Sequence, residues 1–535
     1  MSIAGELHVL LDRAVREIGV EGARYEIEEP ANPAHGDLAS NVALTLSKAL
    51  GRPPRQVAEA LAAEVLRAGP AFVTGVEVAG PGFLNFRVSP AAYQEELHTL
   101  LREGERFFRP ELGGGERVQV EFVSANPTGP LHIGNGWLGT YGDALARLLS
   151  FAGYQVVREY YVNDTGGQIR TLGASILAAR KGEALPEEGY KGDYVFTLAA
   201  SYSGPDDVVA AGRWAVPMIL EEIKESLESL GIGFDSWFSQ ASIEDSGAVA
   251  DVVRRLEESG SVYEQEGALW FEATRFKDSR DRVLRKSNGD YTYLAGDIAY
   301  HYNKLAIRGF DLVVDVFGAD HHGQVSSIKA AMEALGIDPT RLDIRIGQMV
   351  SLLEEGEAVK FSKRAGTAIP LTWLVEELGA DATRLLILSS SIDRAAQVDL
   401  ARAKATSMDN PVYYMQYAHA RIAALFRNAT ERGVLTGHLE STDLSVLREA
   451  RELELLKQVL RLGQVVEMAV RERAPHKVTA WLMEVSAAFH RFYHDLTVLG
   501  AEANVRDGRL ALVRGTQIAL QTAFSLLGVT PLEEM

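Results

Sequence analysis

The spacing of apolar residues divides the chain into parts with different secondary structure. In the first part, Leu7 and Leu11 recur at the spacing of one helix face, and the stretch 76–86 alternates like two strands around a Gly-Pro-Gly turn. The run 109–115, which contains three consecutive glycines, then interrupts the pattern. We therefore expect an N-terminal α/β domain over residues 1–109.

The middle of the chain alternates strand patterns with helix patterns. The stretch 118–122 alternates as a strand, and 312–317 is a second candidate for a buried strand, with a helix predicted after it at 325–335. Strands that alternate with helices indicate a parallel, doubly wound sheet of the Rossmann-like kind. We expect this domain to span residues 110–398, with an insertion at about 180–290 that is rich in polar turns.

From about Leu400 the strand patterns stop. Long helical periodicities continue to the C-terminus and are broken near residues 433–442 and 500–508. This pattern predicts an all-α domain over residues 399–535. The expected architecture is therefore multidomain, α/β followed by all-α: an extra N-terminal domain, a Rossmann-like domain with insertions and a C-terminal helical bundle.

Composition narrows the class of protein. A chain of 535 residues is too long for one hydrophobic core and suits about three domains. The absence of cysteine excludes disulfides, cysteine-ligated zinc, iron–sulfur clusters and thiol nucleophiles. The sequence shows no secretory signal and no apolar run near the roughly 20 residues that cross a bilayer. We therefore expect a cytoplasmic protein without a membrane partner.

The charge is distributed unevenly. The net charge of −19 disfavours a nonspecific nucleic-acid binder. However, residues 399–535 contain 16 basic and 16 acidic residues, whereas the first 398 contain 38 basic and 57 acidic ones. The C-terminal part therefore repels an anionic polymer least, although a neutral helical bundle without a ligand is an equally good interpretation of the charge alone.

The segment 118–139 carries the most informative pattern. A predicted strand leads into a glycine-containing loop that opens a helix, and such helix N-termini bind phosphate through free N–H groups and the helix dipole. Gly134, Gly136 and Gly139 also match the dinucleotide fingerprint, with Glu159 at the distance of its ribose-binding acid. An NAD-dependent oxidoreductase is therefore one hypothesis.

Two features disfavour the dinucleotide hypothesis. In the fingerprint the first glycine follows the strand directly, whereas about ten residues intervene here. The intervening loop also brings Asn126 and His132 to the mouth of the helix, where hydride transfer needs no such groups. Nucleotidyl chemistry is the second hypothesis.

Two short segments support nucleotidyl chemistry. His-Ile-Gly-Asn at 132–135 resembles the His-Ile-Gly-His signature of class I aminoacyl-tRNA synthetases, whose two polar side chains bind the ATP phosphates as negative charge develops. Lys-Phe-Ser-Lys at 360–363 resembles that family's Lys-Met-Ser-Lys signature, whose lysines neutralise the leaving pyrophosphate. The resemblance implies catalytic roles for His132, Asn135, Lys360 and Lys363. It also implies an ATP site formed by Pro130, His132, Gly134, Asn135, Gly136 and Lys363.

Further segments resemble arginyl-tRNA synthetases of the bacterial type over the whole chain. These segments are residues 32–42, 80–87, 124–132, 160–169, 291–301 and 409–421. The resemblance implies an ATP-dependent ligase that joins L-arginine to tRNA-Arg through an arginyl-adenylate and releases AMP and pyrophosphate. It further implies that Mg²⁺ arrives with ATP rather than on protein ligands, that the first step needs bound tRNA, and that the protein is a monomer.

The arginine substrate sets its own chemical demands. Its guanidinium stays protonated and favours carboxylate partners. Asp297 lies four residues after Tyr293, so the two share a face if this segment is helical, although a surface carboxylate is the more common explanation of such an aspartate. The resemblance implies an arginine site made of Glu121, Asn126, Gln240, Tyr293, Asp297, His321 and Gln324.

Two residues depart from the family pattern. Asn135 replaces the second histidine of the first signature, and an amide can donate to a phosphate but cannot become cationic. Gln240 stands where the family usually has a second glutamate for the guanidinium, a loss of about 1–3 kcal/mol of arginine binding. These departures leave open a non-catalytic relative that binds RNA or senses arginine.

Contacts with tRNA are expected in two domains. The resemblance implies that the N-terminal domain contacts the tRNA elbow, with Asn32 as a candidate, and that the helical domain reads the anticodon. Tyr413, Tyr414 and Tyr417, together with Arg421, are candidates for base stacking. The helical spacing of the three tyrosines is equally typical of a packed core.

Overall fold

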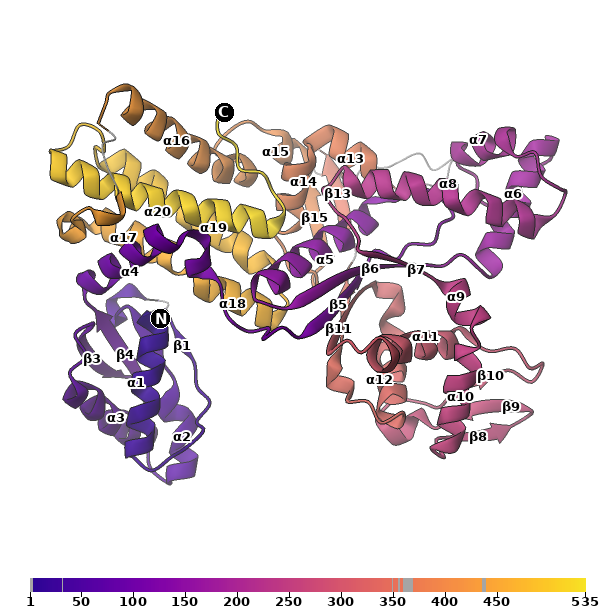
Figure 1. The fold of residues 1–535 in the computed structure, drawn as a ribbon, viewed down its shortest axis with the longest axis horizontal. Coiled ribbons are helices and arrows are strands. Elements are labelled where there is room, and N and C mark those ends of the chain that lie inside the picture. The colour runs from indigo at the N-terminus through magenta and orange to yellow at the C-terminus, as the bar shows by residue number, and fades with distance from the viewer. Residues whose placement is uncertain (1–2, 31, 349, 355–356, 359–368, 435–438) are drawn as a thin grey trace.

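The computed structural model describes residues 3–30, 32–348, 350–354, 357–358, 369–434 and 439–535. It contains an N-terminal domain, a central α/β domain with two extensions, and a helical domain that lies above the N-terminal one in Figure 1. The predicted fold class is confirmed in all three parts.

The N-terminal domain is an antiparallel sheet in the order β1-β2-β4-β3, packed against helices. Its apolar helix positions, such as Leu7, Leu11 and Leu61, are buried in the core between helices and sheet. The elements are α1 (Ile3–Glu17), β1 (Ile27–Glu28), η1 (Pro33–His35), β2 (Leu38–Ser40), α2 (Val42–Leu50), α3 (Pro54–Ala68), β3 (Val73–Ala79) and β4 (Phe83–Val88). The segments α4 (Pro90–Glu103) and η2 (Gly104–Phe108) lead into the central domain.

The central domain is built on five parallel strands in the order β12-β11-β5-β6-β7. The alternation of apolar strands and helices forces helices onto both faces of this sheet. The sheet and its connections comprise β5 (Arg117–Phe122), α5 (Ile133–Phe151), β6 (Gln155–Val162), β7 (Ser236–Ser239), α9 (Gln240–Asp245), α11 (Tyr293–Tyr302), η4 (Asn303–Ile307), β11 (Leu312–Gly318), η5 (Ala319–Gln324), α12 (Val325–Ala334), η6 (Pro339–Arg341) and β12 (Leu342–Gly347).

Two extensions leave the sheet in different directions (Figure 1). One is helical, with α6 (Gly167–Lys181), α7 (Asp193–Ser201) and α8 (Val208–Glu228). The other contains α10 (Ala248–Glu258), η3 (Ala273–Phe276) and an antiparallel sheet of β8 (Val262–Gln265), β9 (Ala268–Phe271) and β10 (Arg282–Arg285). The stretch expected to be one insertion is therefore interrupted, because β7 returns to the main sheet between them.

The end of the central domain adds a smaller sheet in the order β14-β13-β15. Its elements are β13 (Val350–Glu354), β14 (Glu357–Ala358), α13 (Leu371–Leu378), α14 (Ala380–Ile387), β15 (Ala396–Asp399) and α15 (Leu400–Lys404). The helical domain follows with α16 (Pro411–Glu431), η7 (Leu439–Ser441), η8 (Leu444–Val446), α17 (Ala450–Leu460), α18 (Leu462–Glu472), α19 (His476–Asp495) and α20 (Ala503–Leu527). The boundaries expected at 109/110 and 398/399 stay predictions.

Helix α20 is long and apolar enough to cross a membrane by length and composition. However, 78% of its most apolar window is buried inside the protein. Leu512, Leu520 and Phe524 are fully buried in the helical core. Such burial is typical of a central helix in a soluble helical bundle.

Candidate active site

The order of the parallel strands creates a topological switch point between β5 and β11, and sheets of this kind form a ligand crevice beyond the carboxyl ends of the strands at such a point. The chain runs outward from β5 to β6 and β7, and then crosses to β11 and β12 on the other side of β5. In such sheets ligands bind beyond the carboxyl ends of the strands where the direction of winding changes, here between β5 and β11. The loop after β5 carries Asn126, Pro130 and His132, and η5 after β11 carries His321 and Gln324. The fold thus brings together residues almost 200 positions apart.

The loop after β5 begins with a tight turn. Val123 has φ 68° and Ser124 has φ 39°, values that side chains other than glycine rarely adopt, and the Ser124 N–H donates to the carbonyl of Phe122 at 2.9 Å. Such strain costs about 1–3 kcal/mol per residue and collects at functional sites. The Ser124 Oγ holds the turn by donating to Glu121 Oε1 at 2.8 Å and accepting from the Tyr161 N–H at 3.1 Å.

The loop ends at a helix whose first residues cap themselves. His132 is the N-cap of α5: its Nδ1 accepts the Gly134 N–H at 3.1 Å, and Asn135 Oδ1 accepts the His132 N–H at 3.0 Å. Because Nδ1 acts as an acceptor, the neutral ring carries its proton on Nε2. Partial burial lowers the pKa of His132 and favours this neutral form. His132 Nε2 and Asn135 Nδ2 are therefore left as donors at the helix N-terminus.

The segment after the second lysine signature lies beside this helix end. Ile133 N donates to the carbonyl of Ile369 at 3.0 Å, and Leu371 N donates to that of Leu131 at 2.9 Å. Gly136 permits this approach, since an added Cβ would lie 2.3 Å from Leu371. Lys360 and Lys363 themselves lie outside the described residues. The described chain from Ile369 onward is hydrogen-bonded to the His132 segment.

Glu159 contradicts the dinucleotide hypothesis. Its carboxylate is fully buried and accepts hydrogen bonds from Gln119, Tyr300, Arg308 and Ser236. Burial raises its pKa, but the hydrogen bonds from Arg308 and Tyr300 outweigh burial and hold the pKa below its usual range. Glu159 therefore stabilises the sheet and has no free oxygen for a ribose.

Helix α11 carries the predicted arginine-side residues to the same crevice. Tyr293 occupies its first position, 76% exposed, and Asp297 follows one turn later. No hydrogen bond or ion pair joins the Asp297 carboxylate to any residue that the structure describes. Desolvation raises its pKa, whereas the nearby His301 and His321 lower it. This carboxylate is therefore half-buried, and it has no hydrogen-bonded or ion-paired partner among the described residues, although Lys304 also acts on it from a distance.

Below these groups lies a buried ionic network that the sequence analysis missed. Lys304 Nζ donates to Glu121 Oε2 at 2.5 Å and to Asp315 Oδ1 at 2.7 Å, and His301 Nε2 lies 2.8 Å from Asp315 Oδ2. Desolvation lowers the pKa of Lys304, but Asp315 and Glu121 raise it by more. Both oxygens of Glu121 are therefore engaged, one by Lys304 and one by Ser124. An aspartate within the apolar strand 312–317 was the available sequence signal.

The remaining predicted residues lie in the segments that follow β5, β7 and β11. Asn126 and Pro130 are exposed in the loop after β5. His321 Nδ1 lies 3.3 Å from Gln324 Oε1 in η5. Gln240 is half-buried at the start of α9, and its Nε2 donates to Glu244 Oε1 at 2.8 Å. Glu244 is a second acidic residue that the sequence analysis missed, although its spacing from Gln240 is that of one helical turn.

Comparisons with known proteins match every part of this chain. A family model described as tRNA synthetases class I (R), catalytic domain, matches residues 96–190 and 223–425. An arginyl tRNA synthetase N terminal domain model matches 5–88, and a DALR anticodon binding domain model matches 415–535. The arginine–tRNA ligase of Caldanaerobacter subterraneus subsp. tengcongensis is 43% identical over 95% of this chain and 93% of its own. The chain belongs to the arginyl-tRNA synthetase family.

Two further relatives cover the full length. The arginine–tRNA ligase of Carboxydothermus hydrogenoformans is 43% identical over 100% of this chain and 99% of its own. The arginyl-tRNA synthetase structure from Thermus thermophilus superposes with a TM-score of 0.82 over 100% of both chains at 24% identity, a likeness of fold. The predicted resemblance is thus confirmed, and the class I catalytic domain implies use of ATP.

The residues predicted to contact tRNA are exposed or half-buried in this family member. Asn32 is exposed and its Oδ1 accepts the Ala34 N–H at 3.0 Å, a local turn. On α16, Tyr413 stacks on Tyr417 at 5.9 Å between ring centroids, and Arg421 lies over the Tyr417 ring at 5.3 Å. Tyr413, Tyr414 and Tyr417 are half-buried rather than in the core. Their part in tRNA binding stays a prediction.

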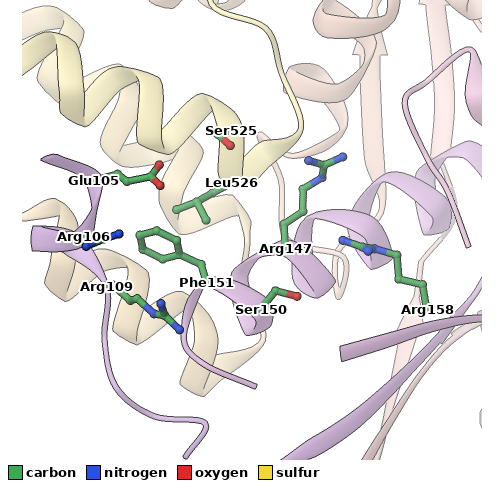
Figure 2. A pocket seen from close by; sticks show the side chains of 9 residues that line it. All are labelled: Glu105, Arg106, Arg109, Arg147, Ser150, Phe151, Arg158, Ser525 and Leu526. Carbon is green, nitrogen blue, oxygen red and sulfur yellow. The ribbon is translucent and has the colours of Figure 1, made fainter. Parts of the chain in front are cut away.

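A cavity of about 530 Å³ lies at the opposite end of α5 from His132. Figure 2 shows Arg106 and Arg109 approaching from the segment after α4, and Arg147 and Arg158 from the central domain, below the end of α20. The C-termini of α5 and α20 meet here, and cations are favourable at helix C-termini. Residues from the segment after α4, the central domain and α20 therefore line this cavity together, and none of the predicted site residues is among them.

Proposed function

We propose that the chain ligates L-arginine to tRNA-Arg in two steps. An oxygen of the arginine carboxylate attacks the α-phosphorus of ATP, which gives arginyl-adenylate as pyrophosphate leaves. A hydroxyl of the 3′-terminal ribose of tRNA-Arg then attacks the activated carbonyl carbon, and AMP leaves. Membership of the arginyl-tRNA synthetase family supports this reaction.

The observation that carries the proposal is the Asp297 carboxylate. It is desolvated, it has no hydrogen-bonded or ion-paired partner among the described residues, and it lies within electrostatic reach of His321 in η5 after β11. A guanidinium supplies the missing charge through charge-assisted hydrogen bonds. We assign Tyr293 to the same substrate group, since it lies one turn from Asp297 and is free to cover a bound ligand.

The α-amino end of arginine is assigned to the loops after β5 and β11. Asn126 offers an exposed amide, and His321 with Gln324 lies across the crevice. In this proposal Glu121 does not bind the substrate directly, because its two oxygens already accept hydrogen bonds from Lys304 and Ser124. Its negative charge still favours an ammonium group above it.

The phosphates of ATP are assigned to the N-terminus of α5. His132 Nε2–H and Asn135 Nδ2–H donate toward the developing negative charge, and the helix dipole adds to their effect. Gly134, Gly136 and Pro130 are assigned to the same ATP site, where Gly136 acts indirectly, because its missing Cβ makes room for Leu371. Lys360 and Lys363 are assigned to the departing pyrophosphate on the strength of the sequence signature alone.

Mg²⁺ is assigned to the ATP phosphates rather than to the protein. Among the residues that the structure describes, no group of three or more histidine, aspartate and glutamate side chains could hold a metal ion. Mg²⁺ commonly binds through substrate phosphates and water, with few protein ligands. When bound, it neutralises charge on the phosphates.

The helical domain is assigned to the anticodon through Tyr413, Tyr414, Tyr417 and Arg421, and the N-terminal domain to the tRNA elbow near Asn32. Half-buried aromatic rings beside an arginine provide surfaces on which bases can stack. A monomeric, cytoplasmic enzyme completes the proposal.

The test is arginine-dependent exchange between ATP and pyrophosphate, measured with and without tRNA-Arg. Lysine and citrulline serve as controls, because one lacks the planar guanidinium and the other lacks its charge. We expect exchange that needs both arginine and tRNA-Arg. Folded protein that binds tRNA-Arg but shows no exchange would instead support a non-catalytic relative.

A further inference from the structure

Gln240 and Glu244 form a side-chain pair whose orientation is fixed by chemistry. Gln240 Nε2 donates to Glu244 Oε1 at 2.8 Å, and Thr165 Oγ1 donates to Glu244 Oε2 at 3.1 Å. Because a carboxylate accepts hydrogen bonds and does not donate, the amide must turn its nitrogen toward Glu244. The Gln240 Oε1 is then left for a different partner, which has to be a donor.

Hydrogen bonds to the loop after β6 fix the start of α9, which carries Gln240. Asp164, in the loop after β6, accepts the Ser239 Oγ–H at 2.6 Å and the Ala241 N–H at 3.0 Å, which fixes the start of α9. Several carboxylates act on the Tyr161 hydroxyl. Desolvation raises its pKa most, and Asp297, Glu121 and Glu244 raise it further. The Tyr161 ring stacks on Tyr300 of α11 at 4.2 Å and on Phe238, just before α9, at 6.3 Å between ring centroids, so Tyr161 lies between the two helices that carry Asp297 and Glu244.

The carboxylates around Tyr161 differ in how far they are engaged. Glu121 is held by Lys304 and Ser124, and Asp164 is held by α9. Asp297 is the carboxylate without a described partner. Glu244 is exposed, and its described partners are Thr165 and Gln240. Gln240 Oε1 is thus an acceptor at the start of α9 with no hydrogen bond to a described residue.

We propose that Glu244 is a positioning residue that turns the Gln240 amide so that its Oε1 faces the substrate guanidinium, opposite Asp297. A guanidinium offers five N–H donors and no acceptor, so only the oxygen side of an amide can bind it. Without Glu244 the amide could present its NH₂ group instead. This inference rests on the proposed function, since it assumes arginine in this crevice.

The same orientation would exclude neutral analogues. Citrulline carries a urea oxygen in place of one guanidinium nitrogen, and that oxygen needs a donor. An amide locked with its oxygen inward offers none, whereas an amide free to rotate could present its NH₂ group to the urea. Glu244 therefore acts on both arginine affinity and the discrimination between arginine and citrulline.

The experiment compares three variants of the full chain with the native protein. Glu244→Gln removes the charge and lets both amides turn. Asp245→Asn is the matched control, because Asp245 is the exposed neighbour on α9 with the same charge change. The double variant Gln240→Glu with Glu244→Gln exchanges the two groups, so that the amide at 244 donates to a carboxylate facing the substrate.

Two readouts are needed: arginine binding by calorimetry, and aminoacylation of tRNA-Arg with arginine or citrulline varied. We expect Glu244→Gln to raise the arginine Kd and KM about tenfold, a difference of about 1.4 kcal/mol, with kcat within about twofold. Its preference for arginine over citrulline should fall by at least the same factor. The control should behave as native, and the exchanged double variant should regain most of the lost affinity.

Two outcomes overturn the inference while leaving the proposed function intact. In one, Glu244→Gln binds and uses arginine as the Asp245→Asn control does. In the other, the exchanged double variant is as weak as Glu244→Gln, which would mean that the amide–carboxylate pair is not what holds the substrate. Native protein that binds arginine without aminoacylating tRNA would overturn the proposed function, and the binding readout would still test Glu244. Native protein that does not bind arginine would overturn both.

Discussion

The two ends of helix α5 show how one element serves two opposite electrostatic tasks. Its 19 residues separate them by about 28 Å. At the N-terminus, His132 and Asn135 cap the backbone and leave N–H donors facing the crevice. At the C-terminus, Arg147 and Arg158 gather near the end of α20 (Figure 2).

The difference follows from the helix dipole and from what each end must satisfy. The N-terminus carries partial positive charge, so added donors concentrate positive potential where an anion is to bind. The C-terminus carries partial negative charge, and the buried Asp143 carboxylate nearby adds a full negative charge. The arginines there neutralise both. Basic residues therefore mark the structural end of this helix, and uncharged donors mark the end proposed to bind phosphate.

The largest expected effect is a loss of stability from a substitution near the C-terminal end of α5. Arg384 is fully buried, and it donates to Asp143 Oδ2 at 2.5 Å and to the carbonyls of Leu230 and Leu527 at 2.8 and 2.9 Å. Arg384→Met leaves both carbonyls without this donor and removes the buried cation from Asp143, which keeps only the partly exposed Arg147 and Arg158, so we expect a loss of about 3–5 kcal/mol in the free energy of unfolding. Urea denaturation measures it. Arg147→Met is the control: its side chain is 33% exposed, and a loss as large as that of Arg384→Met would contradict this account.

The next effect breaks the proposed catalytic end. His132→Ala removes a donor from the ATP site, and we expect the arginine-dependent exchange rate to fall about 10²–10³-fold. Loss of the cap should cost only about 1 kcal/mol of stability. His132→Asn should restore the cap but not the rate, because asparagine caps well and has a shorter reach.

Ser150→Ala is the matched change at the other end of α5, where the side chain is exposed beside the arginines. It should leave the exchange rate unchanged. Exchange within about threefold of native in His132→Ala would remove His132 from the proposed mechanism.

Local patterns made much of this architecture predictable. The stretches 118–122 and 312–317 are neighbouring parallel strands, and a loop connects the first of them to α5. The strands and the helix were predictable because short-range periodicity determines where each begins and ends. The interruption of the insertion by β7 was not predictable, since Ser236–Ser239 is too short to give a periodic signal. The predicted site residues stay predictions. Those within the described chain, apart from the tRNA candidates, lie at the end of β5, in the segments after β5, β7 and β11, or on α11.

Long-range burial explains what the sequence analysis missed. Lys304 and Glu121 are 183 positions apart, and nothing in either local pattern indicates that they meet at 2.5 Å. The Gln240–Glu244 pair is different, because a spacing of four residues in a helix brings side chains together and was open to prediction. Gln240 was considered alone as a lost carboxylate, although a carboxylate lies one turn away.

The smallest expected effect uses pH to separate the two ends of α5. His132 Nδ1 accepts the Gly134 N–H only when it is unprotonated, and burial lowers the pKa of His132 below its ordinary value of 6.5. The unfolded chain therefore takes up this proton at a higher pH than the folded one. The stability that depends on neutral His132 is complete above about pH 6.5 and is lost as the pH falls through the lower pKa of the folded state.

Arginines stay charged throughout this range, so the C-terminal end of α5 should not respond to pH. As the pH falls from about 7.5 to 5, the unfolding free energy of native protein should therefore drop below that of His132→Asn, because the asparagine cap does not titrate. The gap between native protein and Arg384→Met should stay constant, because both contain His132. A gap between native protein and His132→Asn that did not change with pH would mean that the cap does not depend on the neutral imidazole.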